Sequence, residues 1–432
     1  MMNFQMFKKN ISPQGVASKL KQFIAAIFSL KFDTPISKLQ SCDVLMFCHD
    51  GDRGAKKNGQ RYAQLTDSLG DLLSDEGFKI STITIGATHI PPQQSYREPI
   101  ALNRYMILYS LLRTIKLNNP ANQVLKYAFD LCIKQSNCKV IVTQQAWTGL
   151  IAAARKNKTP VYLLIHGIGY PVLDESHKGK DPFDFPDYYL VLDQITSNTL
   201  STIIPKDRII PTAHPWLRQF EKSNSNHTED WLVPQQLKKS LKNFKKVILV
   251  SLQYGYDGED KNYDGILSNG ILHEDIISAI KETEHEVAWI IRLHPRQLMK
   301  MHYLSHRLFV NNLQKQYKNV FTENIATIPL PSLLREIDGH ITMISMTCYE
   351  SAWCNVPSLV LCPTTLPGGI NQNYFHDLVE NAIIEKKEIS KEVIIAWVLQ
   401  TKKLKDNKNQ IRYFNDKALE HIHQMITKIS SF

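Results

Sequence analysis

Two stretches of the C-terminal half decide the fold: W-I-I-R-L-H-P-R at residues 289–296, and H-I-T-M-I-S-M-T-C-Y-E-S-A-W-C-N-V-P-S-L-V-L-C-P at residues 340–363. Each contains a short apolar run typical of a buried strand, and each run ends abruptly at polar groups. In an open α/β sheet, ligands bind beyond the carboxyl ends of parallel strands. The groups at these two points can hold an anion or a ribose, and they are Arg292, His294, Arg296, Ser345, Thr347 and Glu350. We therefore predict a donor-nucleotide site formed by the two stretches on neighbouring strands.

The second stretch predicts a strand over residues 341–344 and a helix over Thr347–Trp353. The hydroxyls of Ser345 and Thr347 would donate to phosphate oxygens, and the free N–H groups of the first helical turn would point the same way. Glu350 lies one turn along the helix, where its carboxylate would accept hydrogen bonds from ribose hydroxyls. The alternative is that either hydroxyl simply caps the helix.

The first stretch places a histidine directly before a proline. Proline fixes its own φ and keeps the preceding residue extended, so His294 is held at the end of its strand by Pro295. Arginines lie on both sides and supply permanently charged, planar donors, so we interpret His294 as a phosphate ligand. A buried structural histidine is the alternative.

The order of these motifs resembles that of bacterial sialyltransferases and polysialyltransferases of the GT-B type, in which they hold the cytidine monophosphate of the donor. The S-x-T-x-x-E pattern, followed by Pro357, also resembles GT-B glycosyltransferases in general. More distantly, it is similar to teichoic acid glycerophosphotransferases and nucleotide-sugar epimerases. The resemblance implies an α/β fold with two Rossmann-like domains facing a cleft.

The length and composition suit a two-domain enzyme, since the chain has 432 residues, of which 43% are hydrophobic and 21% charged. The most polar, aperiodic stretch lies just after residue 220 and is interpreted as a linker. In GT-B folds the last helix often crosses back to the first domain, which would suit the basic tail. The predicted divisions are a basic amphipathic segment at 1–40, an acceptor domain at 41–222, a linker at 223–245, a donor domain at 246–385 and C-terminal helices at 386–432.

The N-terminal domain opens with a predicted strand over Asp43–Cys48, a glycine-rich charged loop over His49–Gly59 and an amphipathic helix over Gln60–Glu76. This is a Rossmann-like opening, but it lacks G-x-G-x-x-G, so no dinucleotide site is predicted there. The resemblance implies that this loop faces the acceptor, which would give Asp50 a place in the cleft. A solvated charged loop is the alternative.

The best candidate for a general base is His166, which ends the apolar strand over Val161–Ile165 and begins H-G-I-G-Y-P. Its unperturbed pKa near 6.5 lets it take a proton from an acceptor hydroxyl at neutral pH. Asp50 is the second candidate. The His-Gly pair is similar to that of teichoic acid polymerases, whereas sialyltransferases use an acidic D/E-D/E-G motif, which this chain only approximates. That departure argues against sialic acid specificity and leaves open that His166 is a substrate ligand.

The formal net charge of +10 indicates an acidic partner. Nucleotide phosphates, an acidic glycan, an anionic membrane surface and nucleic acid all fit the charge. No nucleic-acid-binding motif is present and the lysines are dispersed, so binding to nucleic acid is only a distant alternative. The seven cysteines form no C-x-x-C pair, which favours free thiols in a reducing cytoplasm and predicts no metal site.

The basic N-terminus contains a short apolar run, Phe23–Leu30, with lysines on both sides. It is too short for a membrane span and lacks a cleavage site, so secretion is not expected. A helix lying on the inner face of the plasma membrane and a helix packed on the protein itself are equally consistent with it. The predicted location is therefore the cytoplasm, either free or peripheral on that membrane.

Together these features predict a metal-independent glycosyltransferase, inverting or retaining, that uses a CMP-sugar or NDP-sugar as co-substrate and needs no further cofactor. The predicted acceptor is a bacterial surface glycan of the capsule, lipopolysaccharide or O-antigen type, or its lipid-linked form. The alternative is a polyol-phosphate transferase that uses CDP-glycerol or CDP-ribitol.

Overall fold

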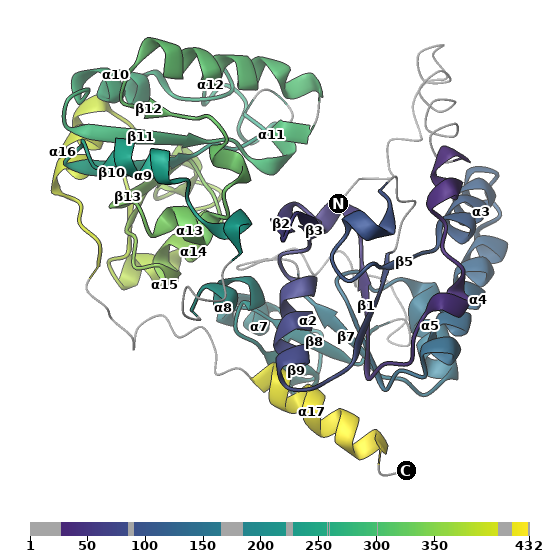
Figure 1. Ribbon diagram of the computed structural model, residues 1–432. Coiled ribbons are helices and arrows are strands. Elements are labelled where there is room, and N and C mark those ends of the chain that lie inside the picture. Colours follow the sequence, from purple (N-terminus) through teal and green to yellow (C-terminus); the bar gives the residue numbers. More distant parts are fainter. Residues whose placement is uncertain are drawn as a thin grey trace. The chain divides into compact units, whose positions relative to one another are not determined.

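The computed structural model describes residues 27–84, 90–165, 185–221, 228–256, 258, 260–299, 301–404 and 417–430 (Figure 1). The chain forms two compact units, each built around a parallel sheet. The first unit runs to Trp216 and takes in the last helix, α17 (Lys417–Ser430), and the second unit begins at Leu217. The division falls slightly before residue 222, where the sequence predicts the end of the first domain.

Within the described ranges, the first unit has a parallel sheet of seven strands in the order β5-β4-β1-β6-β7-β8-β9. The strands are β1 (Val44–Cys48), β4 (Ile80–Thr84), β5 (Ile100–Ala101), β6 (Val140–Thr143), β7 (Val161–Leu164), β8 (Tyr188–Val191) and β9 (Ile209–Pro211). The helices are α2 (Thr66–Asp75), α3 (Asn103–Thr114), α4 (Asn118–Ser136), α5 (Thr148–Lys156), α7 (Gln194–Leu200) and α8 (Pro215–Glu221), the last at the unit boundary.

The central strands of this sheet are apolar along their whole length because helices cover both faces. All five residues of β1, V-L-M-F-C, are buried. On one face, Phe129 of α4 meets Phe47 of β1 edge to face, with ring centroids 5.2 Å apart. Such burial on both sides explains why the strands were recognisable as continuous hydrophobic runs.

The predicted helix over Gln60–Glu76 is wrong in its first part. An antiparallel hairpin of β2 (Ala55–Lys57) and β3 (Gln60–Tyr62) precedes α2, which begins only at Thr66. Asn58 and Gly59 form its turn with φ values of 53° and 76°, a left-handed conformation that an Asn-Gly pair adopts readily. The Asn-Gly signal was present in the sequence, but the helical spacing of the following leucines outweighed it.

The helix α17 belongs to the first unit although it follows the second unit in the sequence. Ala418, Ile422 and Ile426 recur every four residues and are buried on one side of the helix. On a neighbouring side, Nδ1 of His421 lies 3.1 Å from the hydroxyl oxygen of Tyr162 in β7. The apolar stripe of α17 therefore completes the core of the first unit.

Within its described residues, the second unit has a parallel sheet of six strands in the order β12-β11-β10-β13-β14-β15. The strands are β10 (Lys246–Ser251), β11 (Val287–Arg292), β12 (Val320–Phe321), β13 (Gly339–Thr342), β14 (Ser358–Val360) and β15 (Ile384–Lys386). The helices are α9 (Gln235–Leu241), α10 (Glu274–Glu282), α11 (Pro295–Met299), α12 (Leu304–Gln316), α13 (Leu330–Leu334), α14 (Thr347–Trp353), α15 (His376–Glu380) and α16 (Lys391–Gln400).

The stretch predicted as a linker, residues 223–245, is largely structured where it is described. It contains the 3-10 helix η9 (Glu229–Trp231) and α9, and the side chains of Trp231 and Leu241 are buried. The hydroxyl of Ser332 in α13 donates to the carbonyl of Trp231. This part of the chain therefore belongs to the core of the second unit.

Candidate functional site

The second sheet changes direction at β10. The chain runs from β10 outward through β11 and β12, and then returns to the other side of β10 as β13 (Figure 1). The strands β14 and β15 follow outward from β13. In open α/β sheets such a reversal leaves a crevice beyond the carboxyl ends of the two central strands, where ligands bind. The two polar motifs follow β11 and β13, so they flank this crevice. The prediction that they lie on neighbouring strands is wrong, because β10 separates β11 from β13.

A glutamine that the sequence analysis did not single out joins the two motifs. Oε1 of Gln253, just after β10, accepts from the N–H of Ile344 at 2.6 Å, and its Nε2 donates to the carbonyl of the same residue. On the other side, Nε2 of Gln297 donates to the carbonyl of Gln253 at 3.1 Å. The sequence did not predict this role for Gln253, although the residue follows the end of a central strand.

The same Gln297 fixes the His-Pro motif. Its Oε1 accepts from the N–H of His294 at 2.8 Å, and the His294 ring lies against Tyr254 with centroids 4.8 Å apart. Nδ1 of His294 accepts from the N–H of Arg296 at 3.1 Å. Burial, and then the charges of Arg296 and Arg292, lower the pKa of His294 to about 4. The ring is therefore neutral at pH 7, with its proton on Nε2, and can donate one hydrogen bond to an anion.

Arg292 and Glu350 come from different motifs and interact electrostatically. Burial raises the pKa of Glu350 to about 7, and the positive charge of Arg292 opposes that rise. Nη1 of Arg292 donates to the carbonyls of Ile325 at 2.6 Å and Ile328 at 2.7 Å. Burial lowers the pKa of Arg292 to about 10, so it stays charged at pH 7. Arg292 therefore holds the loop after β12 and supplies a fixed positive charge near Glu350.

Arg296 is the second cation of this edge. Its guanidinium carbon lies 4.3 Å from the centroid of the Tyr254 ring, a cation–π contact that limits how the side chain can move. Tyr254, immediately after Gln253, thus packs against both Arg296 and His294. A planar cation held in this way suits the recognition of phosphate.

The hydroxyls of Ser345 and Thr347 contact each other at 2.7 Å. Oγ of Ser345 also accepts from the N–H of Thr347 at 3.2 Å, so the capping role weighed for this serine is present. The two hydroxyls carry two protons, and their mutual hydrogen bond uses one of them. The other proton can be donated to a ligand, so capping and ligand binding are compatible.

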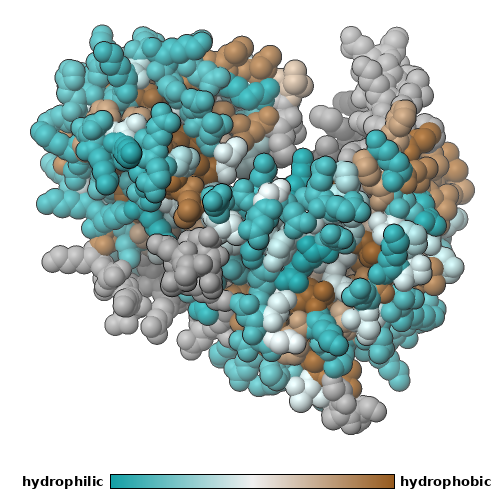
Figure 2. Space-filling view, viewed as in Figure 1, coloured by the Kyte–Doolittle hydropathy of each residue, from teal (hydrophilic) through white to brown (hydrophobic). Residues whose placement is uncertain are grey.

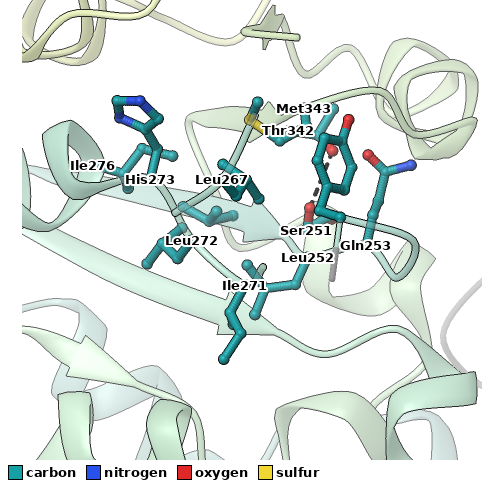
Figure 3. A pocket seen from close by; sticks show the side chains of 12 residues that line it. Ser251, Leu252, Gln253, Leu267, Ile271, Leu272, His273, Ile276, Thr342 and Met343 are labelled. Carbon is teal, nitrogen blue, oxygen red and sulfur yellow. Dashed lines mark hydrogen bonds between the residues drawn. The ribbon is translucent and has the colours of Figure 1, made fainter. Parts of the chain in front are cut away.

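Beneath the polar edge, the space between β10, β13 and α10 is filled by apolar side chains, including Leu252, Leu267, Ile271 and Leu272 (Figure 3). The cavity that remains there is about 10 Å³, enough for no more than one water molecule. The hydroxyl of Thr342 donates to the carbonyl of Ser251 at 3.0 Å across its floor. This cavity is therefore too small to hold a nucleotide.

The two candidates for the base belong to the first half of the chain. His166 lies outside the described residues. The backbone of Asp50 begins a 3-10 helix, η4 (Asp50–Asp52), but its side chain is not described. The proposed roles of both residues stay predictions.

The first unit carries a charged cluster that the sequence analysis did not find. The carboxylate of Asp71 in α2 accepts hydrogen bonds from Lys57, Tyr62, Tyr96 and Arg97 at 2.6, 2.7, 2.9 and 2.7 Å. The donors come from the hairpin β2–β3 and from the loop before β5, so one carboxylate ties both segments to α2. Their separation along the chain is why spacing alone could not reveal the cluster.

A buried ion pair lies beside this cluster. Nη1 of Arg53 is 2.6 Å from Oδ2 of Asp67, and neither side chain is accessible to solvent. Burial raises the pKa of Asp67 to about 6, although Arg53 opposes the rise. The loop after β1, predicted as a substrate-facing or solvated loop, is thus held to α2 by a buried arginine.

Nothing among the described residues brings three or more histidine, cysteine, aspartate or glutamate side chains together as metal ligands would be. Over the same part of the chain, no helix is both long and apolar enough to cross a membrane.

The fold is similar to solved structures of enzymes named for nucleotide-sugar and teichoic acid chemistry. A putative UDP-N-acetylglucosamine 2-epimerase from Listeria monocytogenes matches with a TM-score of 0.58 and 13% identity over 89% of this chain and 95% of that one. A UDP-GlcNAc 2-epimerase from Neisseria meningitidis bound to UDP-GlcNAc matches with a TM-score of 0.53 and 13% identity over 89% and 99%. The wall teichoic acid polymerase TagF soaked with CDPG matches with a TM-score of 0.51 and 12% identity over 97% and 99%.

No protein-family model matches the sequence, and no curated protein matches it significantly. The structural likenesses confirm the predicted fold class, an α/β chain with two Rossmann-like domains of the GT-B type. At these identities they establish the fold alone. The narrower resemblance to sialyltransferases stays a prediction.

Proposed function

We propose that this chain is a glycosyltransferase that moves a sugar from a nucleotide-sugar, either a CMP-sugar or an NDP-sugar, to an acceptor hydroxyl. The observation that carries the proposal is that two motifs from separate strands lie at one edge of the second sheet, tied together through Gln253 and Gln297. That edge lies at the switch point of the sheet, where nucleotides bind in folds of this type. Both positively charged side chains and a carboxyl group are available at this edge.

The charges of this edge suggest how the donor would be held. Arg296 and the Nε2–H of His294 would bind the phosphates, together with the outward proton of the Ser345–Thr347 pair. Glu350 would accept from the ribose hydroxyls, and Arg292 would add positive potential. Cations on the phosphates stabilise the negative charge of a leaving nucleotide, so this mechanism requires no divalent metal.

The acceptor side of the proposal rests on the sequence. We assign the role of general base to His166 first and to Asp50 second. The acceptor would be a bacterial surface glycan, of the capsule, lipopolysaccharide or O-antigen type, or its lipid-linked form. The enzyme would act in the cytoplasm or at the inner face of the plasma membrane.

A second candidate is the transfer of a polyol phosphate from CDP-glycerol or CDP-ribitol. It is favoured by the likeness to TagF, which extends over 97% of this chain. The same positive edge would hold a cytidine nucleotide in either reaction.

Turnover experiments separate these functions. The purified chain is incubated with each nucleotide donor, with and without a lipid-linked glycan acceptor. The masses of the products are then measured by mass spectrometry. Transfer of a sugar mass supports the glycosyltransferase, and transfer of a glycerol or ribitol phosphate mass supports the second candidate. Conversion of the nucleotide-sugar to an isomer without any acceptor would replace both with an epimerase.

Binding tests the site itself. Cytidine, uridine, guanosine and thymidine nucleotides are compared by calorimetry, and we expect one class to bind. Loss of the His294 hydrogen bond to phosphate in His294→Ala should weaken that binding about tenfold or more. His285→Ala, at an exposed position of the same unit, is the matched control. Equal affinity in the two variants would remove His294 from the proposed site.

A further inference from the structure

A large apolar face is exposed on the first unit, at α3 and the beginning of α4. It is brown in the space-filling view (Figure 2). We call it the α3 face, and it is formed by Phe28, Leu108, Leu111, Ile115, Leu117 and Tyr127. Ile115 is 64% exposed and Tyr127 58%. Contiguous exposed apolar surface of this kind marks an interaction site more often than scattered single residues do.

The face is continuous because α3 is apolar on two sides. Met106 and Ile107 pack into the core, while Leu108, Leu111 and Ile115 point outward at helical spacing. A helix in a soluble core needs only one apolar side, so the second side requires another explanation.

The segment that carries Phe28 is fixed beside α3. Nδ2 of Asn103 donates to the carbonyl of Ser29 at 2.6 Å, and the N–H of Arg104 donates to Asp33 at 3.0 Å. Phe28 therefore belongs to the same surface as the side chains of α3.

The exposed charges of α3 are positive. Residues 99–129 contain no aspartate or glutamate, and the neighbouring carboxylate of Asp33 is paired with Arg104. Arg113 and Lys116 are exposed between the apolar residues of the face. Aromatic side chains add to it, since the rings of Tyr105 and Tyr127 lie 6.4 Å apart. Tyrosines at an apolar surface ringed by cations are typical of the zone where protein meets lipid headgroups.

We propose that the α3 face docks on an anionic lipid bilayer. Its leucines, isoleucine and phenylalanine would enter the boundary between headgroups and acyl chains, and Arg113 and Lys116 would contact lipid phosphates. A second copy of the chain fits less well, because a two-fold contact would bring the same cations together with no carboxylates from this stretch to pair them. The inference goes beyond the proposed transfer reaction, and either can fail without the other.

Flotation with lipid vesicles tests the inference. The full chain should float with phosphatidylglycerol vesicles, and much less with phosphatidylcholine vesicles. Ile115→Asp combined with Leu117→Asp should lower the partition coefficient at least about tenfold, and so should Arg113→Glu combined with Lys116→Glu. Leu232→Asp combined with Leu399→Asp, at exposed leucines of the second unit, is the matched control and should float like the wild type.

Three results would overturn the inference. The wild type does not float with anionic vesicles, or the α3 variants float as well as the control, or the Ile115–Leu117 variant changes a dimer to a monomer in sedimentation velocity. The substituted residues are exposed, so circular dichroism and thermal melting should be unchanged, which verifies that each variant is folded. Nucleotide binding measured on the same samples should also stay unchanged.

Discussion

The side-chain amide of Gln253 forms two hydrogen bonds with the main chain of Ile344. It accepts from the N–H at 2.6 Å and donates to the carbonyl. The last paired residues of β10 and β13 are Ser251 and Thr342. The amide therefore continues the pairing of the two strands into the loops that follow them. It holds the loops at the switch point at a fixed separation.

Replacing Gln253 by alanine should destabilise the second unit by about 1–2 kcal/mol, because the N–H and carbonyl of Ile344 lose their partner. Nucleotide binding should weaken as well, since the loop that carries Ser345 is no longer fixed. Urea unfolding and calorimetry measure the two effects. Gln236→Ala, at an exposed position of α9, is the control. If Gln253→Ala matches it in both measurements, the amide does not organise the site.

Glu350 should make the stability of the protein depend on pH. Its pKa is about 7 in the folded chain against an ordinary value of 4.5. A carboxyl whose pKa is raised by folding stabilises the folded state below the ordinary value, and this contribution is lost as the pH rises through 7. Glu350→Gln keeps a neutral group there, so it should be more stable than the wild type at pH 8, on the order of 1–3 kcal/mol.

The measurement is the free energy of unfolding in urea at several pH values. Below pH 4.5, where Glu350 is protonated in both states, the wild type and Glu350→Gln should differ little. Glu323→Gln, at an exposed carboxyl of the same unit, should follow the wild type at every pH. Parallel curves for the wild type and Glu350→Gln would show that the carboxyl is not perturbed.

The hydroxyls of Ser345 and Thr347 should contribute differently to the stability of the protein. Ser345→Ala leaves the N–H of Thr347 without its acceptor and should cost about 1 kcal/mol of stability. Thr347→Val keeps that acceptor and should cost less. Each variant keeps one hydroxyl proton for the ligand but loses the partner hydroxyl that orients it, so both variants should weaken nucleotide binding. If both variants bind nucleotide with unchanged affinity, the two hydroxyls serve only to cap the helix.

Asp71 should be the main stabilising carboxylate of the first unit. Asp71→Asn removes the charge that pairs with Lys57 and Arg97 and should cost about 3 kcal/mol. Chemical denaturation followed by a probe in the first unit gives the value. Asp207→Asn, at an exposed aspartate of the same unit, should change stability by less than about 0.5 kcal/mol. Similar losses in the two variants would refute the role given to the cluster.

The docking of α17 can be tested at its central residue. Ile422 is fully buried, so Ile422→Ala should cost about 2–4 kcal/mol. Gln424→Ala changes an exposed residue of the same helix and should be nearly neutral. Trypsin should cleave α17 faster in Ile422→Ala than in the control, because the helix detaches more often. Equal cleavage rates would indicate that the helix is not part of the unit's core.

The strands were predictable because parallel sheets covered on both faces require continuous apolar runs. Val44–Cys48 and Val161–Leu164 lie within one residue of the predicted limits, and α14 was predicted with its observed ends. The order of the strands was harder to predict. Sequence spacing cannot tell that β10 enters the sheet between β11 and β13, so the motifs were placed on adjacent strands.

The candidate site was predictable only as far as its charged groups follow strand ends. Arg292 and His294 were proposed as site residues in that way, and Glu350 from its place one turn along the following helix. Gln253 and Tyr254 were not, because their roles depend on main-chain atoms and rings brought close by the fold. The double role of Arg292, which donates to two carbonyls and also adds positive charge near Glu350, has no sequence signature either.

The return of α17 to the first unit constrains how the chain is made. The ribosome delivers this helix after the whole second unit, so the first sheet emerges without the side chains that cover part of it. Domains emerging from the ribosome often fold in order of synthesis. Here the first domain is completed only after the second unit has been synthesised, and its uncovered apolar surface would be open to chaperones during that interval.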